Sequence, residues 1–521
     1  QLSLCIGDAE YYLKNLNQDI DAFYLDGFSP SKNPDMWSES IFNLIHRFSK
    51  LNSTFATYSV SSSVKENATK SGFQLEKRKG FGTKKGMLVG KRVIEKTFTS
   101  EDYYINEINN RQFFKLKRNK NIKDVIIIGA GLAGISLASK LAEKKIKTTI
   151  IEKSSKEGEG ASGNPAGIYS PNLTADPTFV SRLTLSGYEY FYREILDLKK
   201  KNYNLQEERI GVFQNVSSQE ELERILKSIE RHELKNFTVE RKHKKFIYNN
   251  KEIELDGFYL NRAGWVSPKQ ILSLKLNQYS EYINLKFNTK VEKIQYTGNH
   301  WELYDREERL IDSCKILILA NSEEINKFPE TSFIFLNKIR GQICFVPLNE
   351  LPINLDIILT HEEGYIIQTE NFFCVGATYN NSDDNIFLEK NHNILLGERL
   401  KMIFPEIDSE NFKNYEGRVG FRSATKDRIP IVGQIPDLNF FETHYQKIQK
   451  GKIQKKLELP KYKEGLFTFG AFGSRGITFS FYLAQYLANL LNGEAITLEK
   501  DLIEGISPSR FIIRDLIKKQ E

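Results

Sequence analysis

The pattern of apolar and polar positions is most regular between residues 124 and 153. An unbroken apolar run at 125–128 indicates a strand buried on both faces, and a second β-branched run follows at 148–151. Between them, residues 135–143 have the composition of a helix. A strand, a helix and a second strand in this order predict a βαβ unit with parallel strands. We therefore expect an α/β fold organised around this unit.

The first 95 residues also alternate between strand and helix patterns. Residues 27–34 contain two prolines and a glycine, which exclude a helix there. These patterns predict part of an α/β domain at 1–96, followed by a linker at 97–121. The predicted elements are strands at 3–6, 21–26 and 53–59, helices at 9–16, 37–48 and 64–71, and a closing hairpin of 73–78 with 87–93.

After the linker, residues 122–521 predict a cofactor domain interrupted by an inserted α+β substrate domain. The cofactor domain takes 122–178, 256–330 and 411–521, and the inserted domain takes 179–255 and 331–410. The predicted elements are helices at 179–201 and 218–232 joined by short strands, a helix that starts at Pro268, strands at 285–294, 315–320, 337–347, 357–359, 364–368, 372–377 and 465–470, and a helix at 477–491.

Three glycines follow the first strand with the spacing G-x-G-x-x-G. Gly129 permits a tight turn, Gly131 lets the backbone approach a pyrophosphate, and Gly134 lets the helix pack closely on the strand. The helix N-terminus offers free N–H groups to the phosphates. Glu152 ends the second strand, with Lys153 beside it, where an acid accepts hydrogen bonds from ribose hydroxyls. Together these features predict a dinucleotide site.

Two further glycine-rich stretches favour a flavin over a nicotinamide cofactor. Residues 158–171 are too rich in small side chains to build a core, which suits a loop passing the pyrophosphate and the flavin ring. Near the chain's end, a strand leads into a glycine-rich turn and an apolar helix, whose dipole can stabilise a reduced flavin. In these stretches the residues expected to contact FAD are Gly160, Ala161, Ser162, Gly473, Ser474, Arg475 and Gly476. Val291, in the predicted strand at 285–294, is expected to contact it too.

Composition narrows the remaining possibilities. The 521 residues carry a formal net charge of +7, which permits a polyanionic partner without requiring one. Four cysteines lie far apart, so we expect reduced thiols and a cytoplasmic location. The seven histidines show no metal-ligand spacing and no apolar run reaches ~18 residues, so we expect neither a metal nor a membrane span. The chain starts with Gln and no leader pattern, so we expect the downstream piece of a longer chain.

The most informative stretch before the linker is Asp26-Gly-Phe-Ser-Pro-Ser-Lys-Asn-Pro, directly after a predicted strand. An acid and an Asn-Pro there occupy the edge where open α/β sheets bind ligands, although a proline-rich turn without chemistry is the alternative. Basic residues with interleaved phenylalanines gather at 77–123, a composition that suits phosphate binding and base stacking. A solvated surface is the alternative for this region too. The lysines expected to contact RNA are Lys79, Lys84 and Lys85.

Several of these motifs resemble those of one family. The Asp26 stretch resembles the active-site motif D-G-F-x-P-x-x-N-P in the methyltransferase half of the bifunctional tRNA wobble-uridine enzymes of the MnmC family, and 79–87 resembles a later glycine-rich stretch of that half. Residues 122–521 resemble the family's FAD-dependent half, a D-amino-acid-oxidase-like flavoprotein related to glycine oxidase. The runs at 160–167, 470–476 and 507–511 carry this second resemblance.

The resemblance implies an activity and a substrate. The family's FAD half oxidises the carboxymethylaminomethyl group, an N-substituted glycine, on the uridine at position 34 of tRNA, and glyoxylate leaves an aminomethyl uridine. A carboxylate is best held by the planar fork of an arginine. The resemblance to glycine oxidase puts this arginine at Arg422, with Arg418 as the fallback. An ion pair of Arg422 with Glu416 or Asp427 is the structural alternative.

The resemblance also implies a second step, in which S-adenosylmethionine methylates the aminomethyl group. Asp26 would help to position the amine for that transfer. A methyltransferase of this class holds its methyl donor with a glycine-rich loop and an acid that would both lie before Gln1. We therefore expect an incomplete methyl-donor pocket and no methyl transfer from this polypeptide alone.

Three functions stay open on the sequence. The first is the FAD-dependent tRNA-modifying oxidoreductase that the family resemblance implies. The second is a free amino-acid oxidase of the glycine-oxidase kind, which would need neither residues 1–95 nor a basic face. The third is a non-catalytic flavin-containing RNA-binding protein, whose flavin no amine would bleach.

Overall fold

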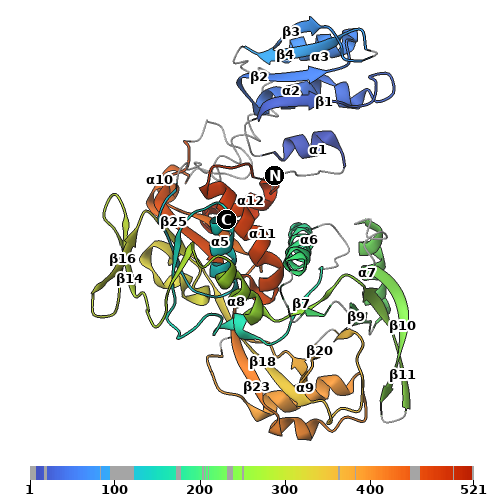
Figure 1. The fold of residues 1–521 in the computed structure, drawn as a ribbon, viewed down its shortest axis with the longest axis vertical. Helices are drawn as coiled ribbons and strands as arrows, with labels where there is room; N and C mark the ends of the chain where they lie inside the picture. The colour runs from blue at the N-terminus through green and yellow to red at the C-terminus, as the bar shows by residue number, and fades with distance from the viewer. Residues whose placement is uncertain are drawn as a thin grey trace. The chain divides into compact units, whose positions relative to one another are not determined.

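The computed structural model divides the chain into two compact units (Figure 1). The first unit contains Gln1–Lys115, Ile448–Leu459 and Glu494–Glu504, and the second contains Leu116–Lys447, Pro460–Gly493 and Gly505–Glu521. The expected strand at 3–6 and the whole of the expected linker at 97–121 lie outside the described residues. The structure describes residues 7–16, 20–82, 84–93, 122–171, 178–201, 203, 205, 207–208, 211–216, 218–231, 239–248, 251–361, 364–381, 383–445, 458–496 and 498–518.

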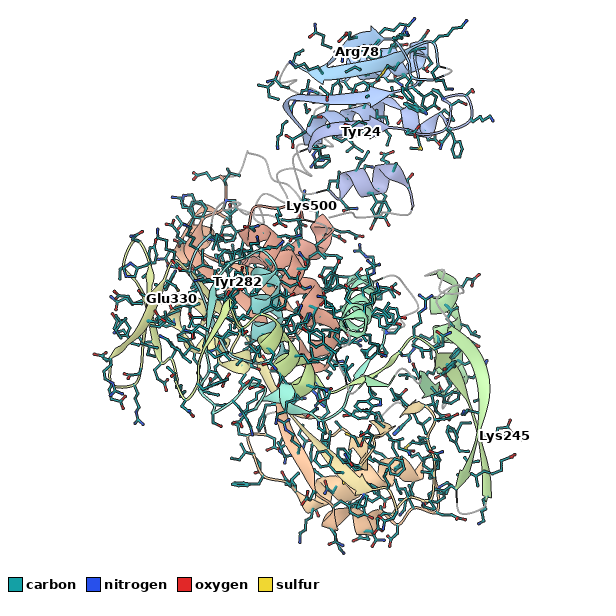
Figure 2. All side chains as sticks on the ribbon, viewed as in Figure 1. Tyr24, Arg78, Lys245, Tyr282, Glu330 and Lys500 are labelled. Carbon is teal, nitrogen blue, oxygen red and sulfur yellow. The ribbon has the colours of Figure 1, made fainter. Side chains whose placement is uncertain are left out.

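The first unit is a four-stranded sheet with helices packed on it. Strand β1 (Ile20–Leu25) runs parallel to β2 (Ser49–Thr57), and β4 (Met87–Arg92) runs antiparallel to both β2 and β3 (Phe73–Arg78). The strand order β1-β2-β4-β3 puts Tyr24 and Arg78 on opposite edge strands (Figure 2). The predicted closing hairpin is therefore confirmed. The helices are α1 (Ala9–Lys14), α2 (Glu39–Phe48) and α3 (Ser62–Lys70).

Helix α2 shows why this unit folds as it does. Ser38 caps its N-terminus by accepting a hydrogen bond from the Ile41 backbone N–H at 3.4 Å. Its apolar residues recur at helical spacing, so Ile41, Phe42 and Ile45 all face the sheet and are buried. They pack with Phe55 of β2 in a core that belongs to this unit.

The second unit is built on the predicted βαβ unit. Strand β5 (Val125–Ile128) and strand β6 (Thr148–Ile151) pair in parallel, as predicted, and helix α5 (Leu132–Ala142) joins them. They belong to a six-stranded sheet of order β13-β6-β5-β17-β25-β24, in which only β24 runs antiparallel to its neighbour. Helices α5 and α11 lie together on this sheet (Figure 1). The remaining elements are β13 (Ile283–Lys286), β17 (Ile316–Leu319), β24 (Ile431–Pro436), β25 (Tyr462–Gly470) and α11 (Gly476–Leu491).

The prediction of one strand at 285–294 is wrong. Strand β13 ends at Lys286, and the chain turns at Asn288, whose φ of +52° lies in the left-handed region. A separate strand, β14 (Lys293–Tyr296), then joins a different, three-stranded sheet with β15 (Trp301–Tyr304) and β16 (Leu310–Cys314). The apolar and polar pattern runs through the turn without a break, so sequence periodicity alone could not reveal it.

A nine-stranded sheet forms the other large part of the second unit. Its order is β10-β11-β9-β19-β20-β21-β18-β22, and β23 pairs with β18 as well. Helix α9 (Lys390–Lys401) covers β18 and β20, and their apolar faces meet in a buried core. The predicted strands at 337–347 and 364–368 are confirmed. The strands are β9 (Val212–Asn215), β18 (Asn337–Pro347), β19 (Ile358–His361), β20 (Gly364–Gln368), β21 (Phe372–Gly376), β22 (Asn380–Asn381) and β23 (Gly417–Ala424).

The prediction of only short strands before residue 255 is wrong. Strands β10 (Val239–Tyr248) and β11 (Lys251–Leu260) form a hairpin of two ten-residue strands, and Lys245 lies on it (Figure 2). Polar side chains fill many of these positions, and Lys245 pairs across the strands with Glu252 at 2.7 Å. Lysine and glutamate are weak strand formers, so cross-strand pairing rather than propensity sets the length of the hairpin.

An ionic cluster with little exposure to solvent joins three helices, α5, α6 and α8. Lys140 of α5 and Lys275 of α8 both bind the carboxylate of Glu194 on α6, and the Lys275–Glu194 distance is 2.9 Å. The two lysine side chains are buried, and that of Glu194 is 13% exposed. The remaining elements of the second unit are α6 (Phe179–Lys200), α7 (Gln219–Arg231), α8 (Pro268–Gln278), α10 (Leu438–His444), α13 (Ser509–Lys518), and a small sheet of β7 (Gly167–Tyr169), β8 (Glu207–Glu208) and β12 (Gly264–Val266). Helix α12 (Lys500–Ile506) has residues assigned to both units.

Three cysteines in the described part of the chain, Cys314, Cys344 and Cys374, are buried free thiols. Burial raises the pKa of each thiol to about 12. No helix among the described residues is long and apolar enough to cross a membrane. Nor do the same residues contain a group of three or more histidine, cysteine, aspartate or glutamate side chains arranged to hold a metal.

Candidate active site

The first glycine-rich turn has the geometry that its spacing predicts. Gly129 has a φ of +109°, and a Cβ there would stand 2.6 Å from the carbonyl oxygen of Ala320. A Cβ on Gly134 would stand 1.9 Å from the carbonyl oxygen of Gly129. Only glycine at both positions lets α5 start so close to β5. Gly131, between them, is the N-cap of α5.

Two side chains organise the backbone around this turn. Glu152 accepts hydrogen bonds from the backbone N–H groups of Ala130 at 2.8 Å and Ser154 at 2.9 Å, one on each carboxylate oxygen. Ser162 Oγ accepts from the Leu132 N–H in the first turn of α5, at 2.9 Å. Each Glu152 oxygen keeps a further lone pair for a hydroxyl donor. The loop at 160–162 is thereby fixed against the start of α5.

A cavity of about 1070 Å³ opens in front of this turn. Ligand pockets commonly measure ~300–1,000 Å³, so this one has room for a dinucleotide and a small substrate group. Of the residues that the sequence assigned to FAD, Gly134 alone is absent from its wall, because it packs against Gly129 instead. Those in the wall are Gly129, Gly131, Glu152, Lys153, Gly160, Ala161, Ser162, Val291, Gly473, Ser474, Arg475 and Gly476.

A second helix N-terminus faces the same cavity. Strand β25 ends at Gly470, and α11 begins at Gly476 after a turn in which Ala471 and Gly473 have φ values of +58° and +57°. Burial lowers the pKa of the Arg475 guanidinium, and neighbouring Arg428 lowers it further. A partly desolvated cation and a helix dipole therefore make this end of the cavity favourable for negative charge.

Arg418 holds the loop at 158–164 rather than lining the cavity. Its guanidinium donates to Asn164 Oδ1 at 3.0 Å and to the carbonyl oxygen of Glu159 at 2.7 Å, and it also donates to the Gly160 carbonyl. Burial lowers its pKa. These contacts hold the loop at 158–164 in place, and residues 160–162 of this loop line the cavity.

Arg422 does line the cavity. It lies on β23 across from β18, and a Cβ on Gly341 of β18 would stand 2.3 Å from its Nη1. Its guanidinium donates to the carbonyl oxygen of Thr378 at 3.3 Å and lies 6.0 Å from the ring centroid of Tyr379. Burial is the main cause that lowers its pKa.

No carboxylate among the described residues forms an ion pair with Arg422. The alternative partner Asp427 is instead bound by Arg510 and Arg514, while Thr425 donates to it at 2.6 Å. The positive charges of Arg510 and Arg514 and these hydrogen bonds outweigh burial, and they hold the pKa of Asp427 well below its usual range. Arg422 is therefore a half-buried cation, and the described residues supply no carboxylate to pair with it. Such a state is costly unless a ligand supplies the anion.

Tyr365, which the sequence analysis did not single out, faces the same cavity from β20. A Cβ on Gly376 of the neighbouring strand would stand 2.7 Å from its hydroxyl oxygen, so the ring lies across that glycine. Burial raises the pKa of this hydroxyl well above its ordinary value, against the opposing effect of Arg422, so it stays protonated and able to donate. Strand alternation predicts which face Tyr365 occupies, but nothing in the sequence places β20 near β23.

The first unit arranges its own candidate residues around Asp26. Trp37 Nε1 donates to the Phe28 carbonyl and the Tyr58 hydroxyl donates to the Gly27 carbonyl, both at 2.7 Å, so the loop after β1 is fixed. Lys84 Nζ lies 5.0 Å from the ring centroid of Tyr58, which brings the loop of the β3–β4 hairpin beside the Asp26 loop. Asp26, Lys79, Lys84 and Lys85 are all exposed, and so are the aromatic rings of Tyr24, Phe28 and Phe81.

Comparison with known proteins decides the family. The FAD dependent oxidoreductase family matches residues 124–490, and the S-adenosyl-L-methionine-dependent methyltransferase family matches residues 1–93. The tRNA 5-methylaminomethyl-2-thiouridine biosynthesis bifunctional protein MnmC of Azoarcus sp. (strain BH72) is 30% identical over 98% of this chain and 77% of its own length. The MnmC protein of Leptospira borgpetersenii serovar Hardjo-bovis (strain JB197) is 32% identical over 99% and 79%. This chain belongs to the MnmC family.

Solved structures support the fold of the MnmC oxidoreductase half. Glycine oxidase from Geobacillus kaustophilus matches with a TM-score of 0.57 and 16% identity over 75% of this chain and 99% of its own. Iminodiacetate oxidase from Chelativorans sp. BNC1 matches with a TM-score of 0.57 and 20% identity over 74% and 99%. At these identities the likeness shows a shared fold, the amino-acid-oxidase type of FAD-binding fold that the sequence predicted.

The cavity of this MnmC chain fits the FAD that its family binds. Gly131 leaves open, on the cavity side of the turn, the space that any side chain would fill. The free lone pairs of Glu152 suit ribose hydroxyls, and the two helix N-termini suit a pyrophosphate and an anionic flavin ring. S-adenosylmethionine is the second cofactor that the family matches imply. The expectation that its pocket is incomplete in this polypeptide stays a prediction.

Proposed function

We propose that this chain catalyses the FAD-dependent removal of the carboxymethyl group from 5-carboxymethylaminomethyl-(2-thio)uridine at position 34 of tRNA, and that it does so in the cytoplasm. The product is 5-aminomethyl-(2-thio)uridine, which the methyltransferase half of the family converts to the methylaminomethyl form. The observation that carries the proposal is the half-buried Arg422 in the wall of the cavity, which pairs with no carboxylate of the described residues. Membership of a bifunctional tRNA-modifying family favours this substrate over a free amino acid.

The overall reaction balances with oxygen as the oxidant. The secondary amine R–NH–CH₂–COO⁻, water and O₂ become R–NH₂, glyoxylate and hydrogen peroxide. When bound, FAD accepts the hydride of the glycine methylene. The chain's own residues bind and orient the substrate, which is the main protein contribution to this kind of catalysis.

Arg422 has the chemistry to set that orientation. Its planar fork can donate two parallel hydrogen bonds to the substrate carboxylate, and its burial strengthens the ion pair. The protonated hydroxyl of Tyr365 can donate a third hydrogen bond to the same group. With the carboxylate held, the methylene beside it is the part of the substrate that faces the flavin site. Arg418 acts as a positioning residue, because it fixes the loop at 158–164.

Anaerobic bleaching of the flavin tests the proposal. The purified protein is mixed, without oxygen, with tRNA that carries the carboxymethylaminomethyl group, and its visible absorbance is followed. We expect full bleaching and one glyoxylate per flavin, while tRNA lacking the modification leaves the spectrum unchanged. Rapid bleaching by free glycine but none by modified tRNA would favour the amino-acid oxidase. No bleaching by either would favour the non-catalytic RNA-binding protein.

A further inference from the structure

The loop between β22 and α9 exposes three large apolar side chains in succession. Ile386, Phe387 and Leu388 are 66%, 72% and 45% exposed. Single exposed apolar residues are ordinary, but a contiguous group at one place commonly marks an interaction site. Ile386 also lines the cavity that contains Arg422, so residues 386–388, here called the apolar loop, stand at its opening.

The apolar loop is held rigidly from beneath by Arg340. This side chain of β18 is 0% exposed, and it donates to the carbonyl oxygens of Asn385 at 2.7 Å and Phe387 at 2.6 Å. It also donates to Gln342 Oε1 at 3.0 Å and to His392 Nδ1 at 2.7 Å. A buried guanidinium with four such bonds fixes both ends of the loop's backbone, so the apolar side chains are presented on a fixed support.

An exposed tyrosine stands on the same support. Asn380 pairs with Arg340 in the ladder between β22 and β18, and the preceding residue, Tyr379, is 46% exposed. The Tyr379 ring lies 6.0 Å from the Arg422 guanidinium carbon. Tyr379 therefore lies next to the strand residue that pairs with Arg340, and its ring is also close to Arg422.

The charges around the apolar loop decide what kind of partner it fits. Asp383 and Asp384 lie just before it in the chain, and both are paired. Asp384 pairs with Lys338 at 2.6 Å, and Asp383 pairs with Arg340 at 3.6 Å. Because each carboxylate is paired, these charges largely cancel and give phosphate groups no marked attraction. Flat, uncharged nucleobases suit the apolar loop, because unpaired bases stack on exposed aromatic rings with little dependence on charge.

We propose that Phe387 and Ile386 of the apolar loop, together with Tyr379, form a stacking platform for the bases next to the modified uridine in the single-stranded anticodon loop. This inference rests on the proposed function and names how its RNA is recognised. A base resting on the platform would place the neighbouring carboxymethyl group toward Arg422.

The test compares variants of Phe387 in the full FAD-loaded chain. Binding is followed with an anticodon stem-loop RNA that carries 2-aminopurine beside the wobble position, since stacking quenches its fluorescence. We expect Phe387→Ala to weaken binding by about 5- to 150-fold, the usual effect of losing one base–aromatic stack, and to remove the quenching. Phe387→Tyr should bind like the parent, and Phe387→Leu should behave like Phe387→Ala because it keeps the apolar area without the ring.

Met402→Ala is the matched control. Met402 is 66% exposed in the same domain, at the end of α9 away from the apolar loop, and it should leave binding and quenching unchanged. Flavin content and melting temperature confirm that each variant is folded. If Phe387→Leu binds the RNA as tightly as the parent, apolar area rather than the aromatic ring is what matters at this position, and the stacking proposal is wrong. If modified tRNA bleaches parent and Phe387→Ala at the same rate constant under limiting RNA, the platform is wrong; if it bleaches neither, the proposed function itself is wrong.

Discussion

The guanidinium of Arg422 lies over the backbone of Gly341, so closely that a Cβ on Gly341 would stand 2.3 Å from its Nη1. A similar contact is made in the same sheet by Tyr365 of β20, which lies across Gly376 of β21. Strands β21 and β18 separate β20 from β23, and one glycine on each of these two strands leaves the space into which Tyr365 and Arg422 extend. The substrate end of the cavity therefore depends on the absence of a side chain at Gly341 and at Gly376.

Replacing Gly341 by alanine should displace the arginine without unfolding the protein. The clashing atom is the flexible end of a side chain, so the sheet can keep its register while the guanidinium moves. We expect normal flavin content, a clearly raised KM for the carboxymethylaminomethyl substrate, and a non-additive double variant with Arg422→Ala. Steady-state kinetics of the single and double variants measure this. Additive effects would show that Gly341 does not act through Arg422.

Removing the arginine should abolish flavin reduction while sparing the cofactor. Loss of a bidentate, partly desolvated ion pair costs about 2–5 kcal/mol, or roughly 30- to 5,000-fold in the rate constant at limiting substrate. Arg422→Lys should recover only part of this, because an ammonium cannot present two parallel donors. Anaerobic bleaching by modified tRNA gives the rate constants. If Arg422→Ala is reduced as fast as the parent, Arg422 is not the carboxylate clamp.

Substitutions at Gly131 and at Gly134 should have different effects, one on flavin binding and the other on folding. Gly131→Val should fold but lose flavin, because its side chain enters the pyrophosphate space and presses on Ser162 Oγ, which lies 3.1 Å from a Cβ at this position. Gly134→Ala should instead destabilise the domain, since its Cβ meets a backbone oxygen at 1.9 Å. Flavin absorbance and circular dichroism separate the two outcomes. Full flavin content in Gly131→Val would mean that the cofactor loop lies elsewhere.

The buried cluster of Glu194, Lys140 and Lys275 should make stability depend on acid pH. Burial opposes ionisation of Glu194, but the two lysines outweigh it and lower its pKa from 4.5 to about 2 in the folded protein. A lowered folded pKa adds stability that is complete above pH 4.5 and is lost as the pH falls toward 2. Thermal melting of the parent should show this loss in that window.

Glu194→Gln is the variant that isolates the cluster. It leaves two buried lysines without their shared carboxylate, so at pH 7 it should cost on the order of 3–5 kcal/mol. Its melting temperature should then fall less steeply between pH 4.5 and 2 than that of the parent, because the titrating group is gone. Exposed Glu66, which pairs only with Lys70 on the surface, provides the control Glu66→Gln, with little effect expected. Equal acid sensitivity of parent and Glu194→Gln would contradict the assignment.

The three exposed lysines of the first unit should contribute to tRNA affinity through phosphates. Neutralising Lys79, Lys84 and Lys85 together should weaken every tRNA alike and reduce the slope of log affinity against log salt by about 2 to 3. Neutralising Lys14, Lys50 and Lys70, which the same unit pairs with carboxylates, is the matched control. Filter binding over a range of salt concentrations gives both slopes. An unchanged slope in the first triple variant would place the RNA face elsewhere.

Local sequence determined the geometry of the first glycine-rich turn. Glycines at 129, 131 and 134 have their structural consequences within one turn of chain, so their spacing alone predicts the bend, the close packing and the open phosphate site. Strands such as Val125–Ile128 were equally predictable, because a short apolar run has few other places to go. The same reasoning erred at 285–294, where a left-handed turn at Asn288 divides one pattern between two sheets.

The substrate end of the cavity was decided by tertiary structure. Tyr365, Gly376, Gly341 and Arg422 come from four strands, and their convergence depends on the order in which those strands pair. Strand order is set by long-range packing, and no residue spacing encodes it. For the same reason, the sequence showed an arginine with several carboxylates nearby in the chain, and only the fold showed that Asp427 binds Arg510 and Arg514 instead. A free charge can be recognised only after every possible partner has been placed in space.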